Sequence, residues 1–207
     1  MKTLSYLIAN LMAGFPDFGF GFLAAVLTAL YLNYPLAWWE PVVAGAVFSV
    51  LPDYDIVPSI LKRAFTGTSY DFDHHQSYLH WPILVLPVVT VVMWYFFGAY
   101  WGNVAFICVF AHYVHDALYM ENGIAWIVRL KRRYEGDSGF STPDDWIGKN
   151  WMQSSWLSLS EMLVGIACFS IALLLMTHNS NLAIACFVGL HAAMFGFWKL
   201  CKSLKYA

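Results

Sequence analysis

The stretch LSLSEMLVGIACFSIALLLMT, which runs from Leu157 to Thr177, contains a single charged side chain, Glu161. A helix needs about 20 predominantly apolar residues to cross the hydrocarbon core of a bilayer, so this stretch is long enough to span it. Similar apolar segments lie at roughly 5–31, 36–52, 81–98, 103–120 and 182–198. The sequence therefore predicts an all-α, polytopic membrane bundle of about six transmembrane helices.

The composition favours the same class of protein. The chain has 207 residues, of which 60% are hydrophobic and only 12% charged. A soluble domain usually has about 25% charged residues. The sequence lacks a basic stripe interleaved with aromatic residues, which excludes nucleic acid as a stable partner. The four cysteines are scattered without any CxxC spacing, which disfavours a disulfide framework and a zinc knuckle.

The positions of the basic residues predict the orientation of the bundle. With six spans, every Lys and Arg falls on one face of the membrane, and the three short loops on the other face have none. The positive-inside rule then places both termini in the cytoplasm. We expect one integral membrane domain over residues 1–207, with a cytoplasmic loop at about 121–156. Its predicted basic face holds Lys2, Lys62, Arg63, Arg129, Lys131, Arg132, Arg133, Lys149, Lys199, Lys202 and Lys205.

Three polar clusters lie at the predicted cytoplasmic ends of the spans. The first is Leu51-Pro52-Asp53-Tyr54-Asp55, and the second is Asp71-Phe72-Asp73-His74-His75-Gln76-Ser77-Tyr78-Leu79-His80. The third, His112-Tyr113-Val114-His115-Asp116, lies inside an apolar segment, where ionisable residues are costly and usually functional. Each cluster also has a structural interpretation, as a helix-ending turn, a loop or a His–Asp pair between helices. Their coincidence on one face favours a metal site.

The residue types in these clusters suit a divalent metal ion. Imidazole nitrogens and carboxylate oxygens bind zinc, the ion we favour, and also manganese, iron or magnesium. His112 and Asp116 are four residues apart and therefore face the same side of a helix. The two aspartates of the first cluster, Asp53 and Asp55, could bridge two ions, or one could bind while the other orients a histidine. The candidate ligands are Asp53, Asp55, His75, His80, His112 and Asp116.

The ordered trio of motifs resembles the YdjM-like membrane-bound metal-dependent hydrolases. The matching pieces are Pro-Asp-x-Asp at 52–55, His-x4-His at 75–80 and His-x3-Asp at 112–116. That family is regulated by LexA in some bacteria and is distantly related to zinc-dependent phospholipase C and the P1-type nucleases. Its members often carry a His near the N-terminus. In this chain the first apolar segment has Asp17 instead, which either substitutes for that His or only bonds neighbouring backbone.

The resemblance implies a hydrolase in the bacterial inner membrane. One or two metal ions would activate water for attack on a phosphoester or a lipid-related substrate at the cytoplasmic face. A carboxylate not engaged with metal, Asp55 or Asp73, would then act as general base. The bilayer is the expected partner.

Two other functions remain open from the residues. A small transporter would use charges within the membrane, for which Asp17 and Glu161 are candidates. A non-catalytic scaffold would use the metal only to staple its helices, and the 121–156 loop would then be its working part.

Overall fold

The computed structural model describes residues 14–66, 78–119 and 155–205. Within these ranges the protein is helical and contains no strand. The long helices are α2 (Phe15–Leu32), α5 (Pro82–Phe97), α6 (Ala99–Tyr119), α8 (Ser155–Thr177) and α9 (Ser180–Lys205). Shorter elements are α3 (Glu40–Val43), η1 (Ala44–Phe48), η2 (Leu51–Ile56), α4 (Val57–Thr66) and η4 (Tyr78–His80). The all-α prediction is thus confirmed for the described residues.

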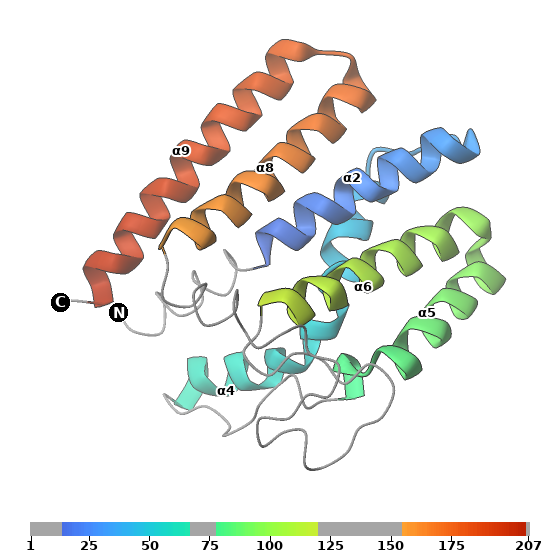
Figure 1. Ribbon diagram of the computed structural model, residues 1–207, viewed down its shortest axis with the longest axis horizontal. Helices are drawn as coiled ribbons and strands as arrows, with labels where there is room; N and C mark the ends of the chain where they lie inside the picture. Colours follow the sequence, from blue (N-terminus) through green and yellow to red (C-terminus); the bar gives the residue numbers. More distant parts are fainter. Residues whose placement is uncertain (1–13, 67–77, 120–154, 206–207) are drawn as a thin grey trace.

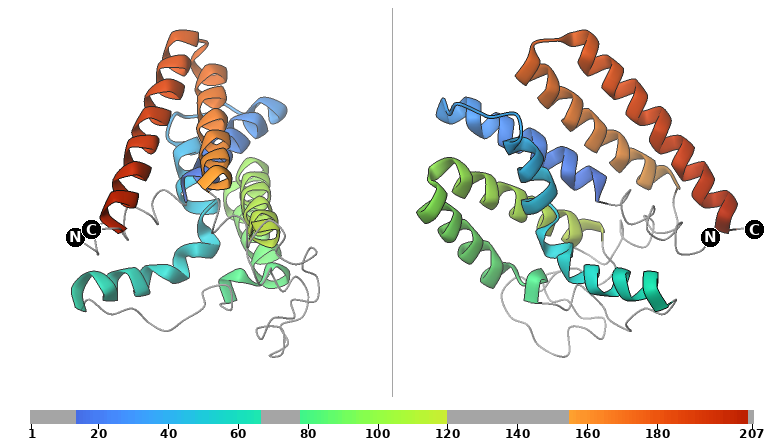
Figure 2. Two further views of the ribbon diagram at one scale, coloured as in Figure 1. Left: turned by 60° about the vertical axis from the view of Figure 1, so that its left-hand side comes forward. Right: turned by 180° about the vertical axis from the view of Figure 1, so that it is seen from behind.

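The long helices lie side by side in the order α9, α8, α2, α6 and α5 (Figure 1). The N-terminal helix α2 is therefore central, between α8 on one side and α6 on the other. Figure 2 shows the same order from behind. This arrangement brings residues from the first half of the chain against both the middle and the C-terminal part.

The residues that end the helices explain the tight connections between them. Asn33 ends α2 in the left-handed conformation with φ 49°, and Gly98 ends α5 with φ 86°. Both residue types adopt positive φ readily. The connection between α5 and α6 is the single residue Gly98, because α6 already begins at Ala99. In the segment that follows Asn33, the carboxylate of Glu40 is buried. It accepts hydrogen bonds from the Tyr34 hydroxyl (2.8 Å) and the Ala37 amide (2.6 Å).

The apolar segment 36–52 does not form one continuous helix. It contains α3, then the wider π-helical turn η1, and is followed by the tight 3-10 turns of η2. Within this wider turn, the Ser49 amide bonds to the Ala44 carbonyl (3.1 Å), five residues earlier. Insertions of this kind re-aim the backbone and are frequent at functional sites. Here the next residues are the Pro-Asp-x-Asp motif.

Glycines allow α2 to approach its neighbours closely. A Cβ atom added to Gly165 of α8 would lie 2.5 Å from the Cα of Pro16, and one added to Gly45 would lie 2.6 Å from the carbonyl oxygen of Phe18. Small residues at helix contacts are typical of membrane bundles, where close backbone approach replaces the hydrophobic effect as a source of attraction. These contacts fix the start of α2 and hence the position of Asp17.

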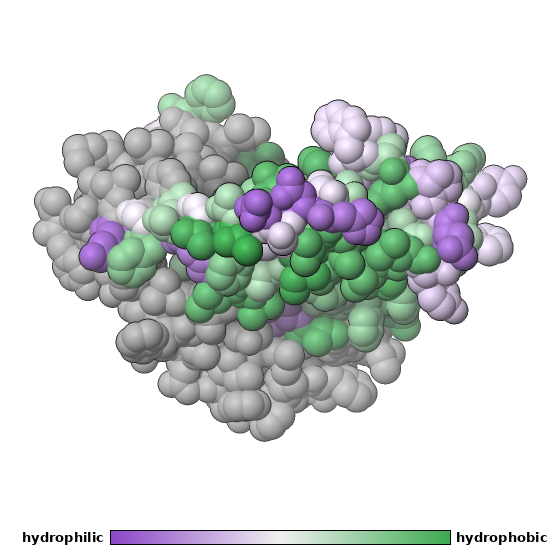
Figure 3. Space-filling view, turned by 90° about the horizontal axis from the view of Figure 1, so that it is seen from above, coloured by the Kyte–Doolittle hydropathy of each residue, from purple (hydrophilic) through white to green (hydrophobic). Residues whose placement is uncertain are grey.

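Apolar side chains cover much of the outer surface. Among the described residues, exposed large apolar groups are frequent on α5, with Val88, Val91, Trp94 and Tyr95 as examples. Seen from above, hydrophilic residues are restricted to small patches in the described part of the surface (Figure 3). Within the ranges that the structure describes, one helix, α2, is both long and apolar enough to cross a membrane, and three apolar helical stretches are shorter. The count of six spans therefore stays a prediction.

Replacing Gly165 by Ala should destabilise the protein, because the new methyl group meets the backbone of α2. Overpacking of this kind typically costs about 1–3 kcal/mol. Gly189 of α9 is a matched control, since an added Cβ there meets no atom within 4 Å. Thermal unfolding of the purified protein in detergent should show a lower midpoint for Gly165→Ala only. An unchanged midpoint would mean that α2 and α8 are not packed at this glycine.

Candidate metal centre

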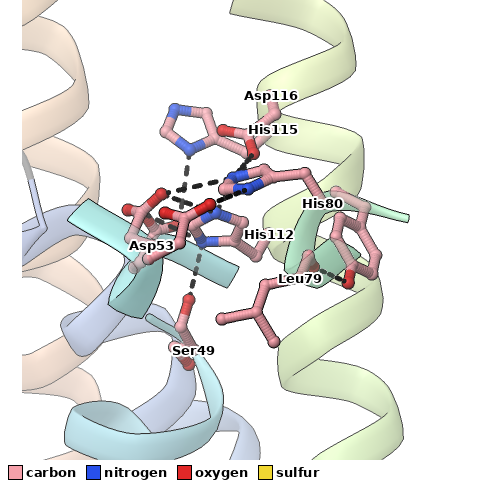
Figure 4. A network of polar contacts seen from close by, with 10 residues as sticks. Ser49, Asp53, Leu79, His80, His112, His115 and Asp116 are labelled. Carbon is pink, nitrogen blue, oxygen red and sulfur yellow. Dashed lines mark hydrogen bonds and ion pairs between the residues drawn. The ribbon is translucent and has the colours of Figure 1, made fainter. Parts of the chain in front are cut away.

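Four side chains from three separate segments point toward one another (Figure 4). Asp53 comes from η2, His80 from η4, and His112 and Asp116 lie one turn apart on α6. One ligand atom from each residue lies within 4.8 Å of all the others. These four residues form a group that could hold a metal ion.

The spacing of the four ligand atoms fits one divalent ion. The Nε2 atom of His112 lies 3.1 Å from Asp116 Oδ2 and 3.4 Å from Asp53 Oδ1. The Nε2 atom of His80 lies 3.4 Å from each of the same two oxygens. A tetrahedral ion with bonds of about 2.0–2.1 Å separates its ligand atoms by about 3.3–3.4 Å. The donor set therefore fits an ion bound by two imidazoles and two carboxylates.

Partners on the far side of each ring orient both histidines. His112 Nδ1 lies 2.7 Å from the carbonyl oxygen of Ser49, which can only accept a hydrogen bond. His80 Nδ1 lies 3.3 Å from Asp55 Oδ2. Each Nδ1 therefore carries the proton in a neutral ring, and each Nε2 presents a lone pair to the cluster. Backbone carbonyls and carboxylates orient metal-binding histidines in the same way.

The electrostatic field at the cluster favours a cation. Burial lowers the pKa of His80, but the nearby carboxylates of Asp116, Asp53 and Asp55 outweigh it and raise that pKa to about 10. Burial works to raise the pKa of Asp53, yet the imidazoles of His112 and His80 hold it well below its usual range. Three carboxylates that stabilise a proton on His80 also stabilise a positive ion at the same place.

The cluster is buried on all sides except at one carboxylate. The residues His80, His112 and Asp116 are 1%, 1% and 3% exposed, whereas the Asp53 side chain is 31% exposed. A substrate or water molecule would reach the ligand atoms from the Asp53 side. Because the four protein ligands fill a tetrahedral ion, a catalytic water would need Asp53 to move aside or the ion to accept a fifth ligand.

A second carboxylate–imidazole contact adjoins the cluster. Asp17 of α2 lies with Oδ1 3.3 Å from His115 Nδ1 and with Oδ2 3.6 Å from His112 Nδ1. The carboxylate thus joins two histidines of α6 to the N-terminal helix. Asp17 thus does more than bond neighbouring backbone, but it is not one of the four residues of the candidate metal group.

Further contacts hold the segments of the cluster in place. The hydroxyl of Tyr113 on α6 donates a hydrogen bond to the carbonyl of Leu79 (2.5 Å), the residue before His80. The hydroxyl of Tyr54 donates to the carbonyl of Ala46 in η1. Tyrosines from within the motifs therefore fasten η4 to α6 and η2 to the π-helical turn.

The sequence-predicted residues divide into three groups. The structure brings Asp53, His80, His112 and Asp116 together and places Asp55 behind His80, in the position that orients a histidine. His75 and Asp73 lie outside the described residues. Two contributors were not predicted: His115, although its place three residues after His112 in an apolar helix was a signal, and the carbonyl of Ser49. No side-chain pattern marks a backbone carbonyl, so only the structure could reveal it.

A comparison with known protein families gives one match. The family model described as "YdjM inner membrane protein" matches residues 12–185 of this chain. The matched range includes Asp17 and all four members of the buried cluster. No curated protein and no solved structure matches the chain.

The geometry predicts different effects for ligands and orienting residues. Asp55→Ala should weaken metal binding about 10–100-fold while leaving one ion bound at saturation, as is typical when an orienting partner is lost. Asp17→Asn should have an effect in the same direction through His112. Titration calorimetry with zinc on the purified metal-free protein would measure both.

Glu40→Gln is the control for these two variants, because it alters a buried carboxylate near the opposite end of α6. Its zinc affinity should equal that of the wild type. Complete loss of binding in Asp55→Ala would instead identify Asp55 as a ligand.

Proposed function

The chain belongs to the YdjM inner membrane protein family, and from this premise we propose that it is a membrane-bound metal-dependent hydrolase. Its substrate would be a phosphoester or a related lipid-linked bond at the cytoplasmic face of the inner membrane. Metal binding is proposed for Asp53, His80, His112 and Asp116. The family description supports the location in the inner membrane, and the residues of the cluster support the chemistry.

The observation that carries this proposal is the orientation of two Nε2 lone pairs toward two carboxylate oxygens. All four atoms are acceptors when the rings are neutral, so they need a positive charge between them, which either a proton on a ring nitrogen or a metal ion supplies. A divalent ion would polarise a phosphoryl oxygen and make a water molecule acidic near neutral pH. Zinc is the ion we favour, because two imidazoles and two carboxylates suit it.

The surrounding side chains support a division of roles. The exposed edge of Asp53 would face the substrate, while Ser49 and Asp55 keep the two rings in place. The Oδ1 atom of Asp55 is buried and has no hydrogen-bond partner within the described part of the chain. A buried carboxylate oxygen of this kind normally binds water or an ion. We therefore propose Asp55 as the group that accepts the proton of the attacking water, with Asp73 as the alternative base.

The location of the cluster supports a phosphoester substrate at a membrane surface. The cluster lies where α6 approaches its C-terminal end, and the basic residues predicted for the cytoplasmic face follow in the sequence. Basic residues near a membrane attract anionic headgroups. A phosphoester linked to lipid would therefore meet both a favourable field and the open side at Asp53.

Metal content provides the first test. The double variant His112→Ala/Asp116→Ala should purify without bound metal, because half of the proposed ligand set is gone. His191→Ala is the matched control, since that histidine lies on α9 and bonds the carbonyl of Phe187 (2.6 Å). Elemental analysis by mass spectrometry should find metal in the wild type and in His191→Ala only. Equal metal content in the double variant would refute the proposed ligands.

Hydrolysis provides the second test, and it separates an enzyme from a metal-stapled scaffold. The wild-type protein in vesicles, loaded with zinc or manganese, should hydrolyse at least one member of a panel of soluble and lipid-linked phosphoesters. Asp55→Asn should retain the ion and lose most of this activity, because the amide cannot accept the proton of water. A protein that binds metal with no turnover on any substrate would favour the scaffold.

A further inference from the structure

The helix α4 leaves the bundle directly after the Pro-Asp-x-Asp motif. It begins at Val57, one residue after η2, and its packing within the described residues is against η2. In the left view of Figure 2, α4 extends outward and crosswise to α8 and α9. Residues 57–66 lie between the apolar segments predicted at 36–52 and 81–98, so this helix was not predicted from the sequence.

The residues of α4 follow an amphipathic pattern. The apolar ones fall at positions 57, 60, 61, 64 and 65, and the polar ones at 59, 62, 63 and 66. At 100° per residue, the apolar positions share one side of the helix and the polar positions share the other. The polar side includes two basic residues, Lys62 and Arg63, and no acidic one.

The apolar side of α4 is not covered by the protein where its side chains are described. Phe65 is 85% exposed and Val57 is 42% exposed. An isolated helix of ten residues is marginal in water, so α4 needs a surface that buries this side. The exposed apolar surface of the bundle already identifies the bilayer as the medium around the protein.

We infer that α4 lies in the plane of the membrane interface, with Phe65 among the acyl chains and its basic side toward anionic phospholipid headgroups. Short amphipathic helices with Lys or Arg on the polar side bind membranes in this way. The bilayer fits better than a second copy of the chain, because it explains both the exposed side chain of Phe65 and the two adjacent basic residues, Lys62 and Arg63.

The position of α4 has a consequence for the metal centre. Since α4 and Asp53 are joined through η2, anchoring this helix fixes the open edge of the cluster at the depth of the headgroups. Resting on the proposed function, this inference assigns the substrate to phospholipid-type phosphoesters held in the bilayer, in preference to soluble ones.

Photocrosslinking tests the location of α4. In the full-length protein, Phe65 is replaced by photoreactive p-benzoylphenylalanine, and a second variant carries it at Thr66, which is also exposed but points about 100° away. Both are reconstituted into vesicles of phosphatidylethanolamine and phosphatidylglycerol and irradiated. Mass spectrometry should find lipid adducts several-fold more often at position 65 than at position 66. Equal labelling, no lipid adduct, or a crosslink to another copy of the chain would overturn the inference.

A second measurement separates this inference from the proposed function. His112→Ala/Asp116→Ala should leave lipid labelling at position 65 unchanged, because the anchoring of α4 does not need the metal. Phe65→Asp should retain metal and lower turnover of the vesicle-borne phosphoester relative to a soluble one. Labelling without any hydrolysis in the wild type would sink the proposed function alone. Hydrolysis with equal effects of Phe65→Asp on both substrates would overturn the substrate assignment alone.

Discussion

Two imidazole nitrogens and two carboxylate oxygens converge on one buried point, and the surrounding structure serves to keep them there. Neutral histidines and ionised aspartates offer only acceptors to one another at this point, so their approach requires a positive charge, either a ring proton or a metal ion. The opposite ends of the rings are fixed by Ser49 and Asp55, which leaves little freedom to turn away. The same buried arrangement would be costly without such a charge.

The sequence was sufficient to predict the members of the cluster that share a helix or end an apolar segment. His112 and Asp116 followed from their spacing of four, and Asp53 and His80 from their positions at segment ends. The separate roles of Asp53 and Asp55 could not be predicted, because both belong to one motif. Only the direction of the backbone decides which of them faces the cluster and which lies behind His80. That direction is set by η1, whose wider turn leaves no mark in the apolar pattern of residues 36–52.

The fold was predicted in outline for similar reasons. Long apolar segments specify helices, and residues such as Asn33 and Gly98 specify where they end. The amphipathic helix α4 was missed because its basic and polar residues hid a regular spacing of apolar ones within a region that looked like a connection. The close contacts at Gly165 and Gly45 could not be predicted either, because the sequence does not show which residue packs against a glycine in a helix.

The contacts of Asp17 have a consequence for how the protein is made. The helix bearing Asp17 precedes the helix bearing His112 and His115 by almost a hundred residues in the numbering. Because synthesis runs from the N-terminus, the Asp17 carboxylate exists before its partners do. Packing of α6 against α2 therefore brings together both the candidate metal ligands of α6 and the partners of the Asp17 carboxylate.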